Sequence, residues 1–189
     1  MSFPVQELAA DLRAAMAAGD GARVLLKAPT GSGKSTMVPG MLLDAGVTGR
    51  ILVVEPRRMA ARLLAGWVAK QRGGQVGQEI GYAVRFDTRY RDDTRIIYLT
   101  DGVFQRWLHE EPDLPGVGAV IFDEFHERRL AVDIALARCL NLQDTSRPEL
   151  RVVVMSATLE PAGLAGFMEP VHSLEAGGRM FPVETLYRP

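Results

Sequence analysis

The sequence predicts an α/β domain in which a mainly parallel β-sheet is covered by helices on both faces, giving three layers. Five short apolar runs are continuous rather than alternating, which is typical of strands buried on both sides. Helical patterns separate these runs, so strand and helix alternate along the chain. The 189 residues are 47% hydrophobic and 24% charged, which suits one compact domain spanning residues 1–189.

The elements follow in order along the chain. Pro4 suits a first helical turn, and apolar residues recur at helical spacing up to Met16, which predicts a covering helix over about residues 4–18. The expected strands are RVLLKA, RILVVE, RIIYLT, GAVIFD and RVVVMS, at residues 23–28, 50–55, 95–100, 118–123 and 151–156. Further helices are expected at roughly 34–45, 58–71, 102–110, 132–141 and 161–167. Residues 71–93, rich in Gly, Arg and Asp, are expected to form loops plus a short edge strand.

A candidate phosphate loop, APTGSGKST at residues 28–36, follows the first expected strand. The general pattern G-x-x-x-x-G-K-[ST] fails at its first position, where Ala28 stands. Gly31 and Gly33 let the backbone wrap with its N–H groups inward, Lys34 reaches the β- and γ-phosphates, and Ser35 ligates Mg²⁺. The alternative is a plain Gly-rich turn, but the strand before and the helix after favour phosphate binding.

A pair of acids follows the fourth expected strand, in AVIFDEFHERR. Asp123 is placed to hold Mg²⁺, and Glu124 to orient and deprotonate the attacking water. Considered alone, such a pair is more often a helix cap or a solvated turn. Together with the phosphate loop, it favours a nucleotide-hydrolysing site.

Composition excludes several classes of protein. The formal net charge is −1, so a nucleic-acid partner would need a local basic patch. The single Cys139 cannot pair within the chain, and three histidines with one cysteine argue against a zinc cluster. No signal peptide and no run of about 18 apolar residues is visible. We therefore expect a cytoplasmic protein with no membrane partner.

Five segments together resemble a known family. APTGSGKST, EPRRMAA, TDGVF, DEFHERR and SAT occur in the order and at the approximate spacing seen in superfamily 2 helicases of the DEAH-box group. DEFHER, GYAVRFD and the ending GGRMFPVETLYRP are most similar to the bacterial HrpB-type branch of that group. The resemblance covers essentially the whole chain and implies a RecA-like P-loop fold. It implies the first of two motor domains, with residues from about 178 to 189 leading towards the second.

The resemblance also implies a role for each matched residue. The catalytic group would be Lys34, Glu124 and His126; the nucleotide would bind Gly31, Ser32, Gly33, Lys34, Ser35 and Thr36; Mg²⁺ would bind Ser35 and Asp123. Nucleic acid would contact Pro56, Arg57, Arg58, Thr100, Asp101 and Gly102, and Ser156, Ala157 and Thr158 would couple nucleotide state to strand movement. Guanidinium groups suit phosphate, although an Arg pair at a helix start is otherwise a solvated feature.

The implied ligands are ATP, with tolerance for other nucleoside triphosphates, Mg²⁺, and single-stranded nucleic acid, with RNA expected. In the family the second RecA-like domain supplies arginines to the transferring phosphate, so this chain alone should bind nucleotide and hydrolyse it poorly. Phe125 stands where the commonest motif has Ala, and it is expected to alter packing against that second domain. Trp67 and Trp107 are expected to serve core packing or surface cover.

Two other classes use the same phosphate loop. A small-molecule kinase or other self-contained P-loop NTPase would be complete in one domain and would not need EPRR or SAT. A nucleotide-binding regulatory module would bind ATP or ADP without turnover. Loss of nucleic-acid binding on changing Arg57 and Arg58 to Ala would separate the motor from both.

Overall fold

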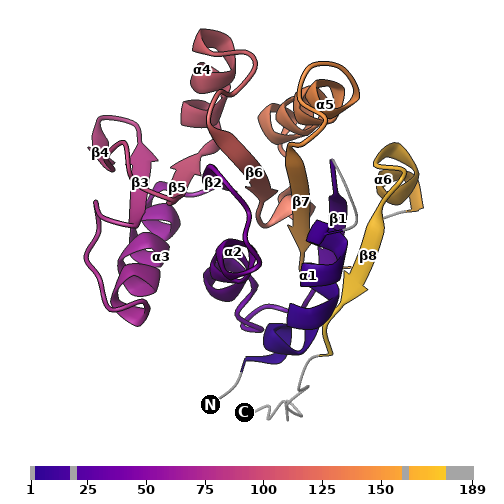
Figure 1. Cartoon of the computed structure of the whole chain (residues 1–189), viewed down its shortest axis with the longest axis horizontal. Helices are drawn as coiled ribbons and strands as arrows, with labels where there is room; N and C mark the ends of the chain where they lie inside the picture. The colour runs from indigo at the N-terminus through magenta and orange to yellow at the C-terminus, as the bar shows by residue number, and fades with distance from the viewer. Residues whose placement is uncertain (1–2, 18–20, 159–161, 178–189) are drawn as a thin grey trace, which may run out of the picture.

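The computed structural model describes residues 3–17, 21–158 and 162–177. In these residues one sheet of eight strands runs in the order β4-β3-β5-β2-β6-β7-β1-β8 (Figure 1). The strands are β1 Arg23–Lys27, β2 Arg50–Glu55, β3 Ile80–Val84, β4 Asp87–Arg89, β5 Ile96–Thr100, β6 Val117–Phe122, β7 Arg151–Ser156 and β8 His172–Glu175. Neighbouring strands are parallel, except for the antiparallel pair β3–β4.

Helices cover both faces of the sheet, as Figure 1 shows. The helical elements are η1 Pro4–Leu8, α1 Ala9–Ala17, α2 Lys34–Asp44, α3 Arg58–Gln71, α4 Asp101–Glu110, η2 Phe125–Glu127, α5 Leu130–Asp144 and α6 Ala162–Phe167. Residues of η1, α1, α2 and α3 share one apolar cluster with the sheet, and residues of α4, α5 and α6 share the other. On β2, Val53 belongs to the first cluster and Leu52 to the second, which explains why the strand is apolar throughout. The predicted three-layer fold is confirmed.

The five predicted strands and the helix at 58–71 are confirmed, and the differences lie elsewhere. The expectation of loops plus one short edge strand in residues 71–93 is wrong for β3, which is buried and pairs parallel to β5 inside the sheet. Within residues 71–93 the short edge strand is β4. The sequence reading missed β8, because its four residues are mostly exposed and lack an apolar run. The first turn of the predicted amino-terminal helix is a 3₁₀ segment, η1.

Strand register brings the motifs to one edge of the sheet. Lys27 at the end of β1 pairs with Ser156 at the end of β7, and Glu55 at the end of β2 pairs with Thr100 at the end of β5. Asp123, one residue beyond β6, donates its amide to the carbonyl of Val54 at 3.0 Å. The residues that follow these five strands therefore converge at the carboxyl edge, where open α/β sheets bind ligands.

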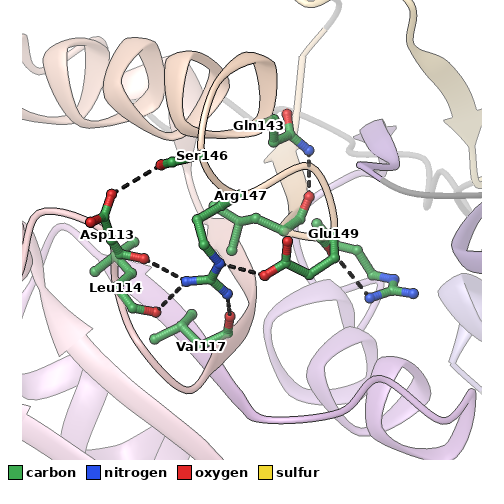
Figure 2. A network of polar contacts seen from close by, with 9 residues as sticks. Asp113, Leu114, Val117, Gln143, Ser146, Arg147 and Glu149 are labelled. Atoms are coloured by element: carbon green, nitrogen blue, oxygen red, sulfur yellow. Dashed lines mark hydrogen bonds and ion pairs between the residues drawn. The ribbon is translucent and has the colours of Figure 1, made fainter.

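The opposite edge of the sheet is held by a polar network centred on Arg147 (Figure 2). Its guanidinium donates to the carbonyls of Asp113 at 2.5 Å, Leu114 at 2.7 Å and Val117 at 2.7 Å, and pairs with Glu149. One side chain thereby joins the loop before β6 to the loop before β7.

Among the described residues, no helix is both long and apolar enough to cross a lipid bilayer.

Candidate nucleotide site and nucleic-acid interface

The phosphate loop leaves the end of β1 and turns into α2. Gly31 and Gly33 have φ values of +80° and +87°, which only glycine adopts without strain. The amide of Ala28 donates to the carbonyl of Ser156 at 3.0 Å, which fixes the start of the loop to β7. The residue that caps α2 is Gly33, which has no side chain to satisfy the first N–H groups of the helix. Those donors and the positive end of the helix dipole therefore face the loop, as an anion site requires.

Lys34 and Glu124 meet inside this site. Lys34 is buried, and its Nζ lies 3.1 Å from Oε1 of Glu124. His126 Nε2 lies 3.4 Å from the other oxygen of the same carboxylate, and its Nδ1 is buried with no hydrogen-bond partner among the described residues. Glu124 has a left-handed backbone, with φ of +49°, which is a strained conformation for this residue type. The three residues predicted to be catalytic are therefore brought together.

Asp123 and Glu55 form a pair of buried carboxyl groups next to these three residues. Asp123 is buried, its Oδ1 accepts the amide of Glu124 at 2.8 Å, and hydrogen bonding with Ser35 stabilises its charged form. Burial nonetheless raises the pKa of Asp123. Glu55, only 2% exposed, lies beside it; burial, and then the negative charge of Asp123, raises the pKa of Glu55 to about 10. The sequence reading missed Glu55, although an acid at the end of an apolar strand was a visible signal.

The residues around Asp123 fit a magnesium ion. Oδ2 of Asp123 is buried and has no hydrogen-bond partner in the part of the chain that the structure describes, and the Ser35 hydroxyl lies next to the carboxyl. Mg²⁺ prefers hard oxygen ligands and is usually held by one or two protein groups together with substrate phosphates. In residues 3–17, 21–158 and 162–177 no cluster of three or more His, Cys, Asp or Glu forms a denser metal site.

A pocket at the phosphate loop, which we call the nucleotide pocket, has an apolar wall as well as the loop at its other end. Its volume is about 600 Å³, and its lining comprises Phe3, Thr30, Gly31, Gly33, Lys34, Ser35, Thr36, Leu63, Leu64, Trp67 and Glu124. Trp67 is 37% exposed, and its ring meets that of Phe3 edge to face, with centroids 6.1 Å apart. Trp67 packs against Phe3, as expected for packing or surface cover, and it also lines this pocket, which the sequence did not indicate. Of the predicted loop residues, Ser32 is buried and is not among the lining residues.

A second pocket, which we call the basic cleft, opens at the same edge of the sheet. Its volume is about 500 Å³, and it is lined by Pro56, Arg58, Arg85, Thr100, Asp101, Gly102, Val103, Arg106 and Arg129. Five of the six predicted nucleic-acid residues are among these, and the sequence reading did not assign three of the four arginines. Arg85 comes from the β3–β4 hairpin, whose neighbouring Phe86 is 89% exposed. The cleft is thus a local basic patch on a chain of nearly zero net charge.

Arg57 is the predicted residue that does not line the basic cleft. Its guanidinium donates to Oε1 of Glu127 in η2 at 2.6 Å. Neighbouring Arg58 instead donates to the carbonyl of Arg85 at 2.8 Å, which holds it against the hairpin. The structure therefore separates the two adjacent arginines, one on the cleft and one on the turn that carries His126.

The remaining predicted residues lie between these sites. Ser156 is buried at the end of β7, and its hydroxyl donates to the carbonyl of Thr158 at 3.1 Å, which closes the turn that includes Ala157. Phe125 is buried in the apolar cluster of α4, α5 and α6, with the Arg128 guanidinium 5.6 Å from its ring centre. Its ring packs within this domain and also lines a pocket of about 410 Å³ with Leu164 and Phe167; the expected effect on packing against a second domain stays a prediction.

A phosphate loop facing an Asp-Glu pair, beside a basic cleft on one sheet edge, defines a P-loop NTPase domain of the helicase type. The chain belongs to the DEAD/DEAH box helicase family, whose sequence model matches residues 4–165.

Similar proteins carry the same assignment. The chain is 41% identical to the ATP-dependent RNA helicase HrpB of Escherichia coli K12 over 189 residues, all of this chain and 23% of that protein. It is 41% identical over 162 residues to the probable ATP-dependent RNA helicase DHR2 of Saccharomyces cerevisiae, which covers 84% of this chain and 22% of that protein. The crystal structure of the Escherichia coli DEAH/RHA helicase HrpB matches 97% of this chain and 23% of its own with a TM-score of 0.90 at 41% identity. The chain thus spans about a quarter of the length of these relatives.

Proposed function

We propose that this chain is the nucleotide-binding motor domain of an ATP-dependent RNA helicase. It binds Mg²⁺ with a nucleoside triphosphate in the pocket at the phosphate loop and grips a single strand in the basic cleft. One observation carries the proposal: the nucleotide pocket and the basic cleft open at the same sheet edge and are joined by residues 123–129. A kinase pocket would need no such second site.

Each residue in the nucleotide pocket has a distinct task. The N–H groups of the loop and of the first turn of α2 bind the phosphates, and Lys34 exchanges its contact with Glu124 for the γ-phosphate. Ser35 and Asp123 would hold Mg²⁺, which when bound neutralises charge on the β- and γ-oxygens. Glu124, released from Lys34, orients the attacking water and accepts its proton.

The base of the nucleotide lies against the wall formed by Phe3, Leu63 and Trp67. An aromatic wall binds any base by its π-face, because stacking needs no particular hydrogen-bonding edge. This supports the expectation that the site accepts several nucleoside triphosphates. It also gives Phe3 and Trp67 a role in affinity that the phosphate loop alone does not supply.

The basic cleft binds the backbone of the strand. Arg58, Arg85, Arg106 and Arg129 present guanidinium groups to phosphates, and such contacts position a nucleic acid without reading its sequence. Phe86, exposed at the hairpin tip beside Arg85, is suited to stack on a base. RNA is proposed rather than DNA because the relatives are named RNA helicases.

Hydrolysis is completed by a second RecA-like domain that would close over the pocket and supply arginine. An arginine provided from outside raises the rate of related nucleoside triphosphatases by roughly 10³ to 10⁵. The 189-residue chain alone should therefore bind Mg·ADP and turn over ATP at far below 1 s⁻¹, a typical lower value for a complete enzyme.

The test combines binding and turnover on the same preparation. Mg·ADP affinity, ATP hydrolysis with and without single-stranded RNA, and RNA affinity are measured for the wild type, with Glu124→Gln as the hydrolysis blank. Arg58→Ala should weaken RNA binding and reduce the slope of log affinity against log salt by about 0.7. Arg13→Ala, an exposed arginine on α1, removes the same charge away from the cleft and should leave RNA binding unchanged.

Each rival class predicts another outcome. Brisk turnover that is lost in Glu124→Gln and indifferent to RNA would identify a self-contained NTPase or kinase. Nucleotide binding without turnover and without RNA binding would identify a regulatory module.

A further inference from the structure

The ion pair between Arg57 and Glu127 connects the start of α3, on the proposed strand-binding face, with η2, which follows the acids of the nucleotide pocket. Arg57 lies at the start of α3, on the side where the strand is proposed to bind, and its side chain is 74% exposed. Glu127 lies in η2, 70 residues further along the chain, and is 28% exposed. The 2.6 Å contact draws the guanidinium away from the basic cleft, which Arg57 does not line.

A second arginine makes the same kind of connection. Arg129 follows η2, and its Nη1 donates to the carbonyl of Pro56 at 2.6 Å and lies 3.1 Å from Oδ2 of Asp101. Pro56 and Asp101 belong to the two segments proposed to contact the strand. The carboxyl-terminal half of the turn at residues 124–129 is therefore attached to the strand-binding face at two residues, Glu127 and Arg129.

This turn is held in a strained conformation. Glu124 and Arg128, which flank η2, both have positive φ values, +49° and +48°. Non-glycine residues adopt this region only when surrounding contacts enforce it. The Arg57 contact with Glu127 is one of these contacts, and Glu124 at the other end of the turn is paired with Lys34. A change at Glu127 thus acts on the backbone that positions the proposed general base.

We propose that Glu127 is a positioning residue that competes with the nucleic-acid backbone for Arg57. When a strand phosphate replaces Glu127, Arg57 turns to the strand, and η2 is freed to move Glu124 and His126. Strand binding would in this way change the nucleotide pocket, because a strand phosphate replaces Glu127 as the acceptor for Arg57. The proposal rests on the proposed function, because it needs both the strand and the nucleotide to bind.

The test is a double-mutant cycle on single-stranded RNA affinity, measured at low salt with a fluorescent oligonucleotide. Glu127→Gln removes the competing charge and should tighten RNA binding about two- to fivefold, the range expected for an exposed ion pair. The gain should disappear when Arg57 is already Ala. Glu79→Gln is the matched control, because Glu79 pairs with Arg72 at 2.7 Å on another part of the surface. It removes the same charge and should leave RNA affinity unchanged.

A second readout distinguishes coupling from simple charge. In the wild type, RNA should change the affinity for Mg·ADP, and by linkage Mg·ADP should change the affinity for RNA by the same factor. Both Arg57→Ala and Glu127→Gln should abolish this mutual effect. Glu127→Gln should retain binding of each ligand, whereas Arg57→Ala should also weaken RNA binding, because it removes a proposed phosphate contact.

The proposal is overturned if Glu127→Gln tightens RNA binding equally with Arg57 present or absent. It is also overturned if RNA affinity does not change, or if both variants keep the mutual effect. These failures differ from failure of the proposed function. If the wild-type chain binds Mg·ADP but no RNA, the motor assignment falls and this inference falls with it. If RNA binds and Arg58→Ala weakens it while the cycle is additive, only this inference is lost.

Discussion

Replacing Trp67 by Ala should weaken nucleotide binding without touching the phosphate contacts. Trp67 lines the nucleotide pocket beside Phe3, whose ring lies against Gly33 of the phosphate loop. Stacking of a base on an aromatic side chain contributes about 1 to 3 kcal/mol. Because Trp67 meets Phe3 edge to face and remains 37% exposed, we expect the lower part of that range, about 1 to 2 kcal/mol. This corresponds to a roughly 5- to 30-fold rise in the Kd for Mg·ADP.

The assay compares ligands with and without a base. Isothermal titration should show weaker binding of ADP, GDP, CDP and UDP to Trp67→Ala, and unchanged binding of pyrophosphate, which makes only phosphate contacts. Trp107→Ala is the matched control, since Trp107 packs edge to face on Tyr90, with ring centroids 5.7 Å apart, outside the nucleotide pocket lining. Equal ADP affinity for Trp67→Ala and wild type, or a loss of pyrophosphate affinity as large as that of ADP, would refute the proposal that the base lies against the apolar wall.

Three further outcomes follow from the site and the fold. Glu55→Gln should stabilise the protein in EDTA. Because the pKa of Glu55 is raised, the folded wild type keeps a proton that the unfolded chain releases, so its stability falls as pH rises from about 4.5 towards 10. In urea unfolding the variant should equal the wild type below pH 4, and its free energy of unfolding should exceed that of the wild type by an amount that grows by at most about 1.4 kcal/mol per pH unit above it; a pH-independent difference would contradict this. Arg147→Ala leaves three backbone carbonyls without their charged donor and should lower the free energy of unfolding by about 2 to 4 kcal/mol, while loss below 0.5 kcal/mol would show that water replaces it. Gly33→Ala places a Cβ 2.7 Å from the ring of Phe3 at φ +87°, so it should cost more in thermal unfolding than Gly46→Ala, where φ is +89° and nothing lies within 4 Å; equal costs would mean that Phe3 moves away freely.

Most of the candidate phosphate site could be predicted from the sequence because its parts are local. The loop, the first turn of α2 and the acids after β6 each lie within a few residues of a strand end, and parallel pairing brings strand ends together. The strand order and β8 were not visible, since the pairing of short or exposed strands depends on distant segments.

The apolar wall and the acceptor of Arg57 could not be predicted in the same way. Helical spacing shows that Trp67 lies on α3. It does not show that Trp67 packs against Phe3, far away in the chain, and lines the nucleotide pocket together with it. Likewise, the Arg-Arg pair shows two cations at a strand end. Which of them meets Glu127 and which lines the basic cleft depends on how η2 and the β3–β4 hairpin pack on either side.

The positions of the two tryptophans make one of them suitable as an intrinsic fluorescent probe. The chain contains two tryptophans, one in the nucleotide pocket and one on α4, where it packs against Tyr90. Replacing Trp107 by Phe would leave a single emitter, in contact with the space that the base is proposed to occupy. Its fluorescence would then follow the arrival and departure of unlabelled nucleotides in real time, so the kinetics of the pocket become measurable without a dye.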